Sequence, residues 1–66
     1  MGGMEHKFTF NERDRVVLTD DVGTWRGEVT ARRFVGEHEV TVVKWDSGMT
    51  EHLAASELIL EADHVG

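Results

Sequence analysis

The 66-residue sequence lacks two residue types that make small domains rigid, since it contains no cysteine and no proline. The absence of cysteine excludes disulfides and thiolate metal sites, and the absence of proline leaves no rigid linker. A chain this short forms one domain at most and buries only about 60% of its unfolded surface, so we expect a thin core. Small domains without cross-links often gain stability by association, and we therefore expect a homodimer or homotetramer.

Long hydrophobic runs are also absent. No apolar stretch approaches the ~20 residues that a membrane-spanning helix needs. The N-terminal residues MGGMEHKFTF carry charge early and contain no apolar segment of the kind found in signal peptides. We therefore expect a cytoplasmic protein.

Basic residues are scarce, because seven Lys and Arg stand against 13 Asp and Glu, for a formal net charge of −6. Generic binding of nucleic acid depends on neutralising phosphates, so this balance disfavours it. Residues 34–66 hold one base, Lys44, and seven acids. Such acids usually serve solubility, but they would also suit a basic partner. Arg26, Arg32 and Arg33 are the candidates for a local basic face.

Short β-branched or alternating segments, separated by turn residues, run through most of the chain. We expect five strands, over residues 15–19, 25–34, 40–46, 49–53 and 57–60. A single helical or 3-10 turn over residues 54–57 would precede the closing strand. Five short strands without a long amphipathic helix predict a small all-β barrel. The competing interpretation is a hairpin followed by a helix from Glu51 to Ala62, whose apolar face Ile59 would interrupt.

Residues 25–34 alternate with a period of two. One predicted face of this strand carries Trp25, Gly27, Val29 and Ala31, and the other carries Arg26, Glu28, Thr30 and Arg32. Such alternation is typical of a half-buried strand in an antiparallel sheet. Gly27 has no side chain to pack, so we expect a bend or a bulge there.

The barrel is expected to span residues 13–61, between a flexible N-terminal segment over residues 1–12 and a flexible C-terminal tail over residues 62–66. Within the N-terminal segment, Phe8 and Phe10 alternate with Thr9. This pattern predicts either a short strand or a clasp on a neighbouring surface.

The segments RDRVVL, GTWRGEV, VVKWDSG and LAASEL follow one another in this order. In this order they resemble the SH3-like barrel superfamily, in which a strand of the type GDRV, a G-x-V strand and a hairpin lead through a short turn to a final strand. The resemblance implies a five-stranded SH3-like barrel with a short 3-10 turn before the last strand. Tudor-like and KOW-like modules and metabolic enzymes share this fold, so the resemblance does not by itself imply a function.

Asp14–Val16, Trp25–Gly27 and Gly48–Leu58 are also similar, more distantly, to segments of the type II plasmid-borne dihydrofolate reductases. That resemblance implies an NADPH-dependent homotetramer in which the strand over residues 49–53 lines a central pore. The V-Q-I-Y motif of these enzymes falls on four residues that do not retain it, namely Thr50, Glu51, His52 and Leu53. In a homotetramer the four copies of Glu51 would lie close together in the pore, where they would repel each other and the anionic cofactor. This repulsion argues against reductase activity.

Seven residues are candidates for binding a ligand or partner: Trp25, Arg26, Arg32, Trp45, Thr50, Glu51 and His52. The tryptophans would form an aromatic wall for a methylated amine or a flat base. Alternatively, Trp45 packs in the core and Trp25 at an interface. Arg26 and Arg32 would share a face and clamp a phosphate or carboxylate, or they would form solvated pairs with acids.

No catalytic or metal-binding constellation is evident in the sequence. His52 and Glu51 are adjacent, and adjacent strand residues point to opposite faces, so they do not form a dyad. The four histidines show no metal-ligand spacing, and we expect neither a metal nor a cofactor.

Three hypotheses follow from the sequence. The first is a non-enzymatic SH3-like module that binds a protein or peptide partner. The second is an NADPH-dependent reductase of the type II kind. The third is a nucleic-acid-associated module of the KOW or Tudor-like kind that uses the arginine-containing strand.

Overall fold

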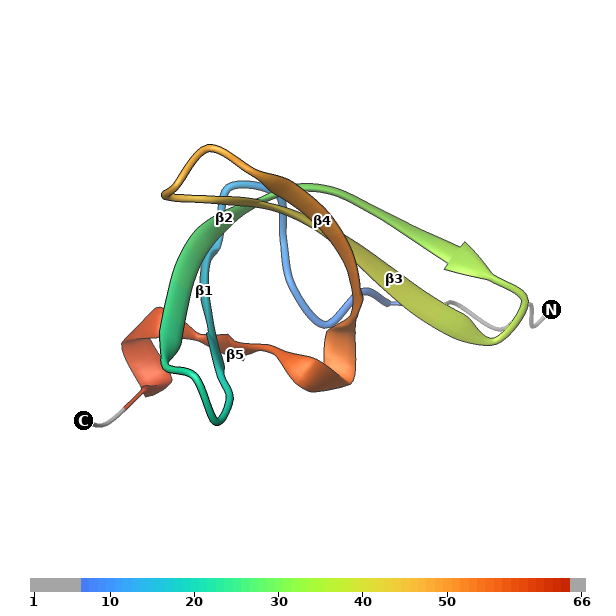
Figure 1. The fold of residues 1–66 in the computed structure, drawn as a ribbon. Helices are drawn as coiled ribbons and strands as arrows, with labels where there is room; N and C mark the ends of the chain where they lie inside the picture. The colour runs from blue at the N-terminus through green and yellow to red at the C-terminus, as the bar shows by residue number, and fades with distance from the viewer. Residues whose placement is uncertain (1–6, 65–66) are drawn as a thin grey trace, which may run out of the picture.

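A computed structural model describes residues 7–64, which form five β-strands and two short 3-10 turns (Figure 1). In chain order these are β1 (Arg15–Thr19), β2 (Thr24–Val35), β3 (His38–Trp45), β4 (Thr50–Ala54), η1 (Ala55–Glu57), β5 (Ile59–Leu60) and η2 (Glu61–Asp63). The described residues contain no α-helix, which confirms the all-β class and excludes the competing helix over residues 51–62. Accordingly, residues 7–64 include no helical segment with the length and apolarity to cross a bilayer.

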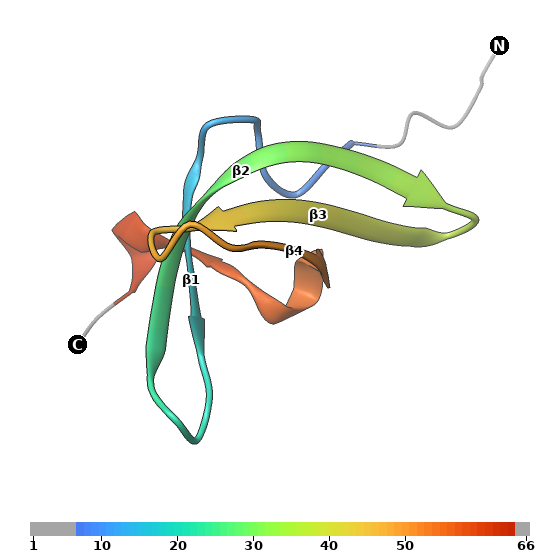
Figure 2. The same ribbon diagram turned by 45° about the horizontal axis from the view of Figure 1, so that its top comes forward.

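The five strands form one antiparallel sheet in the order β4-β3-β2-β1-β5. The sheet is strongly curved, and β2 and β3 extend beyond it as a long hairpin (Figure 2). Among the described residues no ladder joins the edge strands β4 and β5, so the sheet is not closed by hydrogen bonds.

All five predicted strands agree with the structure to within two residues at their ends, and the closing strand begins two residues later than predicted. The predicted turn before it is the 3-10 turn η1, in which the Leu58 N–H donates to the Ala55 carbonyl at 3.1 Å. This turn takes the first residues of the predicted strand over 57–60, so β5 contains only Ile59 and Leu60.

The inner, concave face of the sheet carries the core. Val16, Val29 and Val43 are fully buried, which confirms that Val29 lies on the buried face of the half-buried strand predicted over residues 25–34. The core cluster consists of Phe10, Val16, Val29, Val43, Trp45, Leu53, Ala55 and Leu58. Phe10 therefore brings the N-terminal segment into a core that is otherwise built from the sheet and η1.

Gly27 marks the closest approach of β2 to β3. It pairs with Trp45 across the ladder. A Cβ atom added to Gly27 would lie 2.7 Å from the Lys44 carbonyl oxygen and 2.9 Å from Cε3 of Trp45. Glycine is thus required because the Trp45 ring and the β3 backbone occupy the space of a side chain.

The irregularity of β2 lies at Thr30 and not at Gly27, which corrects the predicted bulge position. Val29 pairs with Val43 and Ala31 pairs with Val42, so β2 contains one extra residue at this point. An extra residue exchanges the two faces of a strand beyond it. Ala31, predicted to face inward, consequently lies opposite Val42 on the outer face.

The bulge also separates Arg26 from Arg32. Arg26 pairs with Val17 on the outer face, whereas Arg32 pairs with the buried Thr41 on the inner face. The prediction that the two arginines share a face is therefore wrong. A strict period of two cannot continue through an inserted residue.

Arg32 instead holds an N-terminal clasp, which we define as residues 8–11. Its Nη1 donates to the Phe10 carbonyl at 2.9 Å, and its guanidinium lies 4.5 Å from the centre of the Phe8 ring. Phe8 in turn stacks on Phe34 at 4.7 Å. Of the two structures predicted for Phe8 and Phe10, a short strand or a clasp, the clasp is thus the one observed. Residues 7–12 belong to the segment expected to be flexible, and its first six residues lie outside the described part.

The last residue of the predicted barrel is held by an outer ion cluster that we define as Arg15, Arg26, Asp46 and Glu61, and the first two residues of the predicted C-terminal tail continue from it in η2. Nη1 and Nη2 of Arg15 donate to Oδ1 and Oδ2 of Asp46 at 2.9 and 2.7 Å. Glu61 lies 3.6 Å from Arg15 and 3.3 Å from Arg26. The cluster joins η2 to β1 and β2, and the last two residues of the chain lie outside the described part.

We expect Gly27→Ala to lower the free energy of unfolding by about 1–3 kcal/mol, because the added Cβ overlaps backbone and ring atoms. The matched control is Gly23→Ala, whose Cβ would meet no atom within 4 Å. Urea unfolding of both variants tests the close approach, which is contradicted if Gly27→Ala is as stable as Gly23→Ala.

We expect the stabilising effect of Asp46 to depend on pH. The hydrogen bonds from Arg15 hold the pKa of Asp46 below its ordinary value of 3.8. A lowered pKa gives a contribution that is present above the ordinary pKa and is lost as the pH falls through the lowered one. Asp46→Asn should therefore be less stable than the parent at neutral pH, and the difference should vanish in acid.

Thermal unfolding from pH 7 down to about pH 2 measures this difference. Asp21→Asn is the control, since Asp21 has no ion-pair partner within residues 7–64. A difference between Asp46→Asn and the parent that stays constant with pH would refute the role of the ion pair.

Candidate functional site

Four of the seven predicted site residues meet in one pocket, which we call the tryptophan pocket. It lies between the β1–β2 and β3–β4 turns, both on the left in Figures 1 and 2. Its volume is about 330 Å³, and it is lined by Leu18, Asp20, Trp25, Trp45, Ser47, Met49, Thr50 and Glu51. The structure thus brings together the predicted residues Trp25, Trp45, Thr50 and Glu51.

The two tryptophans have different roles in this pocket. Trp45 is only 7% exposed and belongs to the core, and its indole N–H donates to Oε1 of Glu51 at 2.9 Å. Trp25 pairs with Leu18 across the β1–β2 ladder and is 42% exposed. Trp45 therefore forms the fixed floor, while Trp25 leaves apolar ring surface open to a ligand.

The charged groups of the tryptophan pocket are both acidic. Oδ1 of Asp20 accepts hydrogen bonds from the backbone N–H groups of Val22 at 2.8 Å and Gly23 at 3.0 Å. The Gly23 bond, then the Val22 bond and to a smaller extent the Trp25 indole lower the pKa of Asp20. Glu51 supplies the second carboxylate, and no Lys, Arg or His lines the pocket. Aromatic faces beside carboxylates attract cations.

The other three predicted site residues lie elsewhere. His52 pairs with Val42 on the outer face, whereas Glu51 pairs with Val43 on the inner face, which confirms that they do not form a dyad. Arg26 belongs to the outer ion cluster, and Arg32 holds the N-terminal clasp. The described residues also contain no group of three or more side chains arranged to hold a metal ion.

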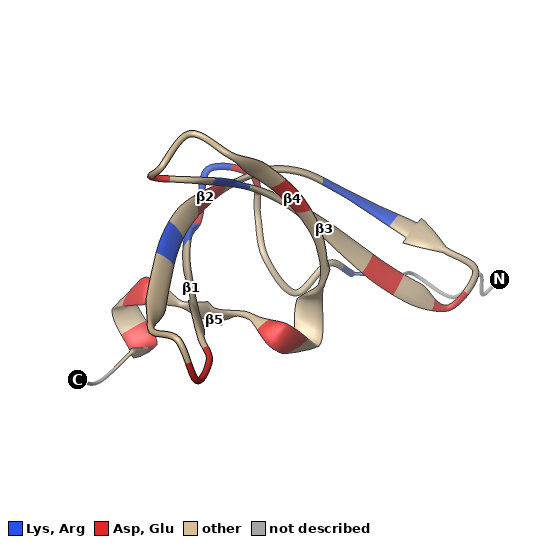
Figure 3. Cartoon of the chain, viewed as in Figure 1, with Lys and Arg blue, Asp and Glu red and all other residues tan. Residues whose placement is uncertain are grey.

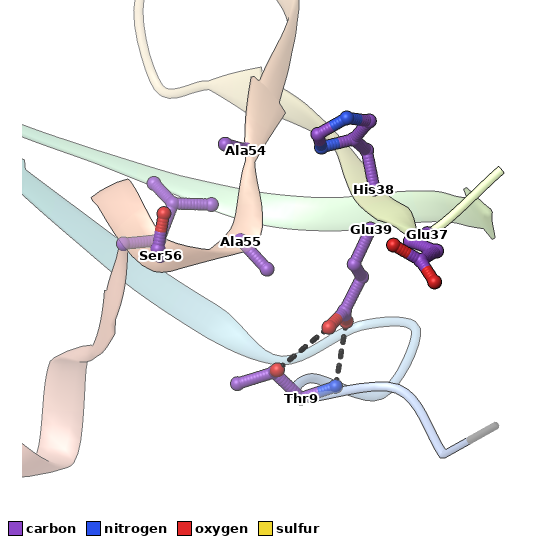
Figure 4. Close-up of a pocket in the computed structure, with 8 residues that line it drawn as sticks. Thr9, Glu37, His38, Glu39, Ala54, Ala55 and Ser56 are labelled. Carbon is purple, nitrogen blue, oxygen red and sulfur yellow. Dashed lines mark hydrogen bonds between the residues drawn. The ribbon is translucent and has the colours of Figure 1, made fainter. Parts of the chain in front are cut away.

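A second pocket, which we call the hairpin pocket, lies beside the start of β3 and the end of β4 (Figure 4). Its volume is about 380 Å³, and it is lined by Thr9, Glu37, His38, Glu39, Ala54, Ala55, Ser56 and Leu58. Oε2 and Oε1 of Glu39 accept hydrogen bonds from the N–H and hydroxyl of Thr9 at 2.6 and 2.8 Å. Glu37 lies beside Glu39 in this view and adds a second carboxylate.

Sequence reasoning missed the pocket residues contributed by the two turns and by the end of β1: Leu18, Asp20, Ser47 and Met49. The signal that would have found them is the connectivity of the predicted sheet. In an antiparallel sheet the β1–β2 and β3–β4 turns lie at the same end. Turn residues next to Trp25 and Trp45 are therefore expected near each other. The hairpin pocket had no such signal, because one of its lining residues, Thr9, belongs to the N-terminal clasp and not to the predicted sheet.

Neither a family model, nor a curated protein, nor a solved structure matches this chain.

We expect the two tryptophans to differ in what they contribute to stability. Trp45→Ala should cost about 3–5 kcal/mol, because it empties the core above Gly27. Trp25→Ala should cost less than half of that, because its ring is partly exposed. Denaturant unfolding of both variants tests this difference. Equal losses would mean that Trp25 is a core residue and not part of a binding surface.

Proposed function

We propose that this chain is a small, non-enzymatic binding module of the SH3-like barrel kind, which recognises a protein or peptide partner. The curved antiparallel sheet and the 3-10 turn before the last strand support the SH3-like part of the proposal. We further propose that the partner docks at the tryptophan pocket through a cationic side chain.

The observation that carries this proposal is the exposure of Trp25 beside two carboxylates. The chain has three phenylalanines and two tryptophans. Phe10 and Trp45 are buried, and Phe8 stacks on Phe34. Trp25 is the most exposed aromatic side chain among the described residues, at 42%, and Met49, which is 71% exposed, continues the apolar surface.

The chemistry of the tryptophan pocket favours a lysine or arginine side chain. The stem of such a side chain is apolar and suits Leu18, Trp25 and Met49, while its charged head suits Asp20 and Glu51. A cation over an indole face gains about 0.5–2 kcal/mol, more when water is excluded. The net charge of −6 would add long-range attraction to a basic partner.

The other two hypotheses have less support. The carboxylates of Asp20 and Glu51 would oppose an anionic cofactor such as NADPH, which disfavours the reductase. The arginines of β2 lie at separate places along the strand (Figure 3). One of them, Arg26, is paired with Glu61, and another, Arg32, packs on the clasp, which disfavours a nucleic-acid face. The homodimer or homotetramer remains a prediction, which light scattering measures.

Calorimetric titration with short capped peptides tests the proposed function. A peptide with one lysine among threonines and valines should bind, and the same peptide with glutamate in place of lysine should not. Trp25→Ala should weaken binding of the lysine peptide by about tenfold, and Glu51→Gln should also weaken it. Glu57→Gln is the matched control, since Glu57 is an exposed acid that lines neither pocket. Binding that ignores the sign of the peptide charge would overturn the proposal.

A further inference from the structure

One side of β4 is open. β4 pairs with β3, and no described strand lies along its other side. The backbone N–H of Trp45 donates to the Met49 carbonyl at 2.7 Å, so these two residues form a hydrogen-bonded pair of the ladder. Hydrogen-bonded pairs alternate along an antiparallel ladder, and Glu51 and Leu53 therefore bond to β3. The backbone N–H and C=O groups of Thr50, His52 and Ala54 face the open side.

This edge carries only one of the usual forms of protection against pairing, the inward-pointing charge of Glu51. Exposed edges are commonly blocked by lysine, proline or a bulge. β4 has the sequence TEHLA and pairs with β3 without a shift in register. Its charged residue on the inner face, Glu51, is turned into the tryptophan pocket and bonded to Trp45. An edge of this kind accepts an extended peptide as an added strand.

The two pockets lie at the two ends of this edge. Thr50 and Glu51, at the start of β4, line the tryptophan pocket. Ala54, at its end, and the following Ala55 line the hairpin pocket (Figure 4). β4 ends at Ala54 and Ala55 begins η1, and a partner strand that runs past both pockets spans about 13 Å over four residues. The buried Leu53 lies between them on the same face.

We propose that β4 accepts a segment of the partner as a sixth strand, and that this segment carries cationic side chains at positions i and i+4 and an apolar one at i+2. Alternation places these three side chains on the inner face, opposite Glu51, Leu53 and Ala55. One cation meets Asp20 and Glu51 in the tryptophan pocket, and the other meets Glu37 and Glu39 in the hairpin pocket. The inference rests on the proposed function and specifies its partner.

Charge complementarity favours a foreign segment over a second copy of this chain. The edge strands of the chain, β4 and β5, contain no lysine or arginine. A second β4 would bring another Glu51 toward pockets that already hold carboxylates. A segment with two cations places one positive charge beside the two carboxylates of each pocket. Because its pattern is symmetric, the segment fits in either strand direction.

The first experiment uses a capped peptide with the pattern Lys-x-Val-x-Lys, in which x is threonine, titrated into the full chain. Replacing either lysine with norleucine should weaken binding about two- to fivefold. Glu51→Gln should weaken binding of the peptide that keeps both lysines, as should Glu37→Gln in the hairpin pocket, while Glu57→Gln should not. A single backbone N-methyl group, moved along the peptide, should weaken binding only at alternate residues, because only these face β4.

The second experiment measures amide hydrogen exchange of the same protein with and without the peptide. The amides of His52 and Ala54 should exchange rapidly in the free chain and about tenfold or more slowly in the complex. The amides of Glu51 and Leu53 should be protected in both states. Docking through side chains alone would leave His52 and Ala54 unchanged.

The outcomes separate this inference from the proposed function. If peptides with one and two lysines bind equally well and the exchange of His52 does not slow, the sixth strand is wrong although the tryptophan pocket still binds. If no lysine peptide binds, both proposals fail. Protection of His52 and Ala54 without peptide overturns the inference. If the protein is then a dimer or a larger oligomer, a second copy of the chain covers β4. If it is a monomer, other residues of the same chain cover β4.

Discussion

The contact of Gly27 with Trp45 is the constraint on which both the core and the candidate site depend. Because glycine leaves no side chain between the strands, the indole of Trp45 lies against β2 and remains buried. In this position its N–H reaches Glu51 of β4 and its ring forms the floor of the tryptophan pocket. One side chain thus fills a thin core, links β3 to β4 and fixes a carboxylate at the pocket. A domain of this size has few residues for packing and for binding, and Trp45 serves both.

The two chain ends compensate for the small sheet. On the inner side, the N-terminal clasp places Phe10 in the core and packs Phe8 between Arg32 and Phe34. On the outer side, Glu61 brings η2 against the arginines of β1 and β2. These additions occupy the hairpin and the outer face, and neither includes the open side of β4. The backbone edge of β4 is therefore left open by both chain ends, while Thr9 of the clasp also lines the hairpin pocket beside it.

The sequence was sufficient to predict the strands, the 3-10 turn and half of the tryptophan pocket, because alternation and turn residues are local signals. It was insufficient for the bulge at Thr30, which involves no glycine or proline and follows from packing across strands. That omission led to the wrong face for Arg32, and with it the loss of a predicted arginine pair. Pocket residues such as Met49 were missed because a pocket between two turns depends on how the sheet curves.

The bulge at Thr30 also makes the length of β2 more critical than its composition. Side chains before it serve the core, and side chains after it serve the clasp, so one backbone supplies two packing layers with opposite phase. Deleting Thr30 would remove the bulge and leave Arg32 and Phe34 on the inner face, whereas inserting a residue after Ala31 would turn Arg32 and Phe34 toward solvent and Val35 inward, even though every hydrophobic residue is retained. Insertions beyond the bulge should therefore be selected against more strongly than substitutions, whereas loss of Thr30 itself would leave the faces of β2 unchanged.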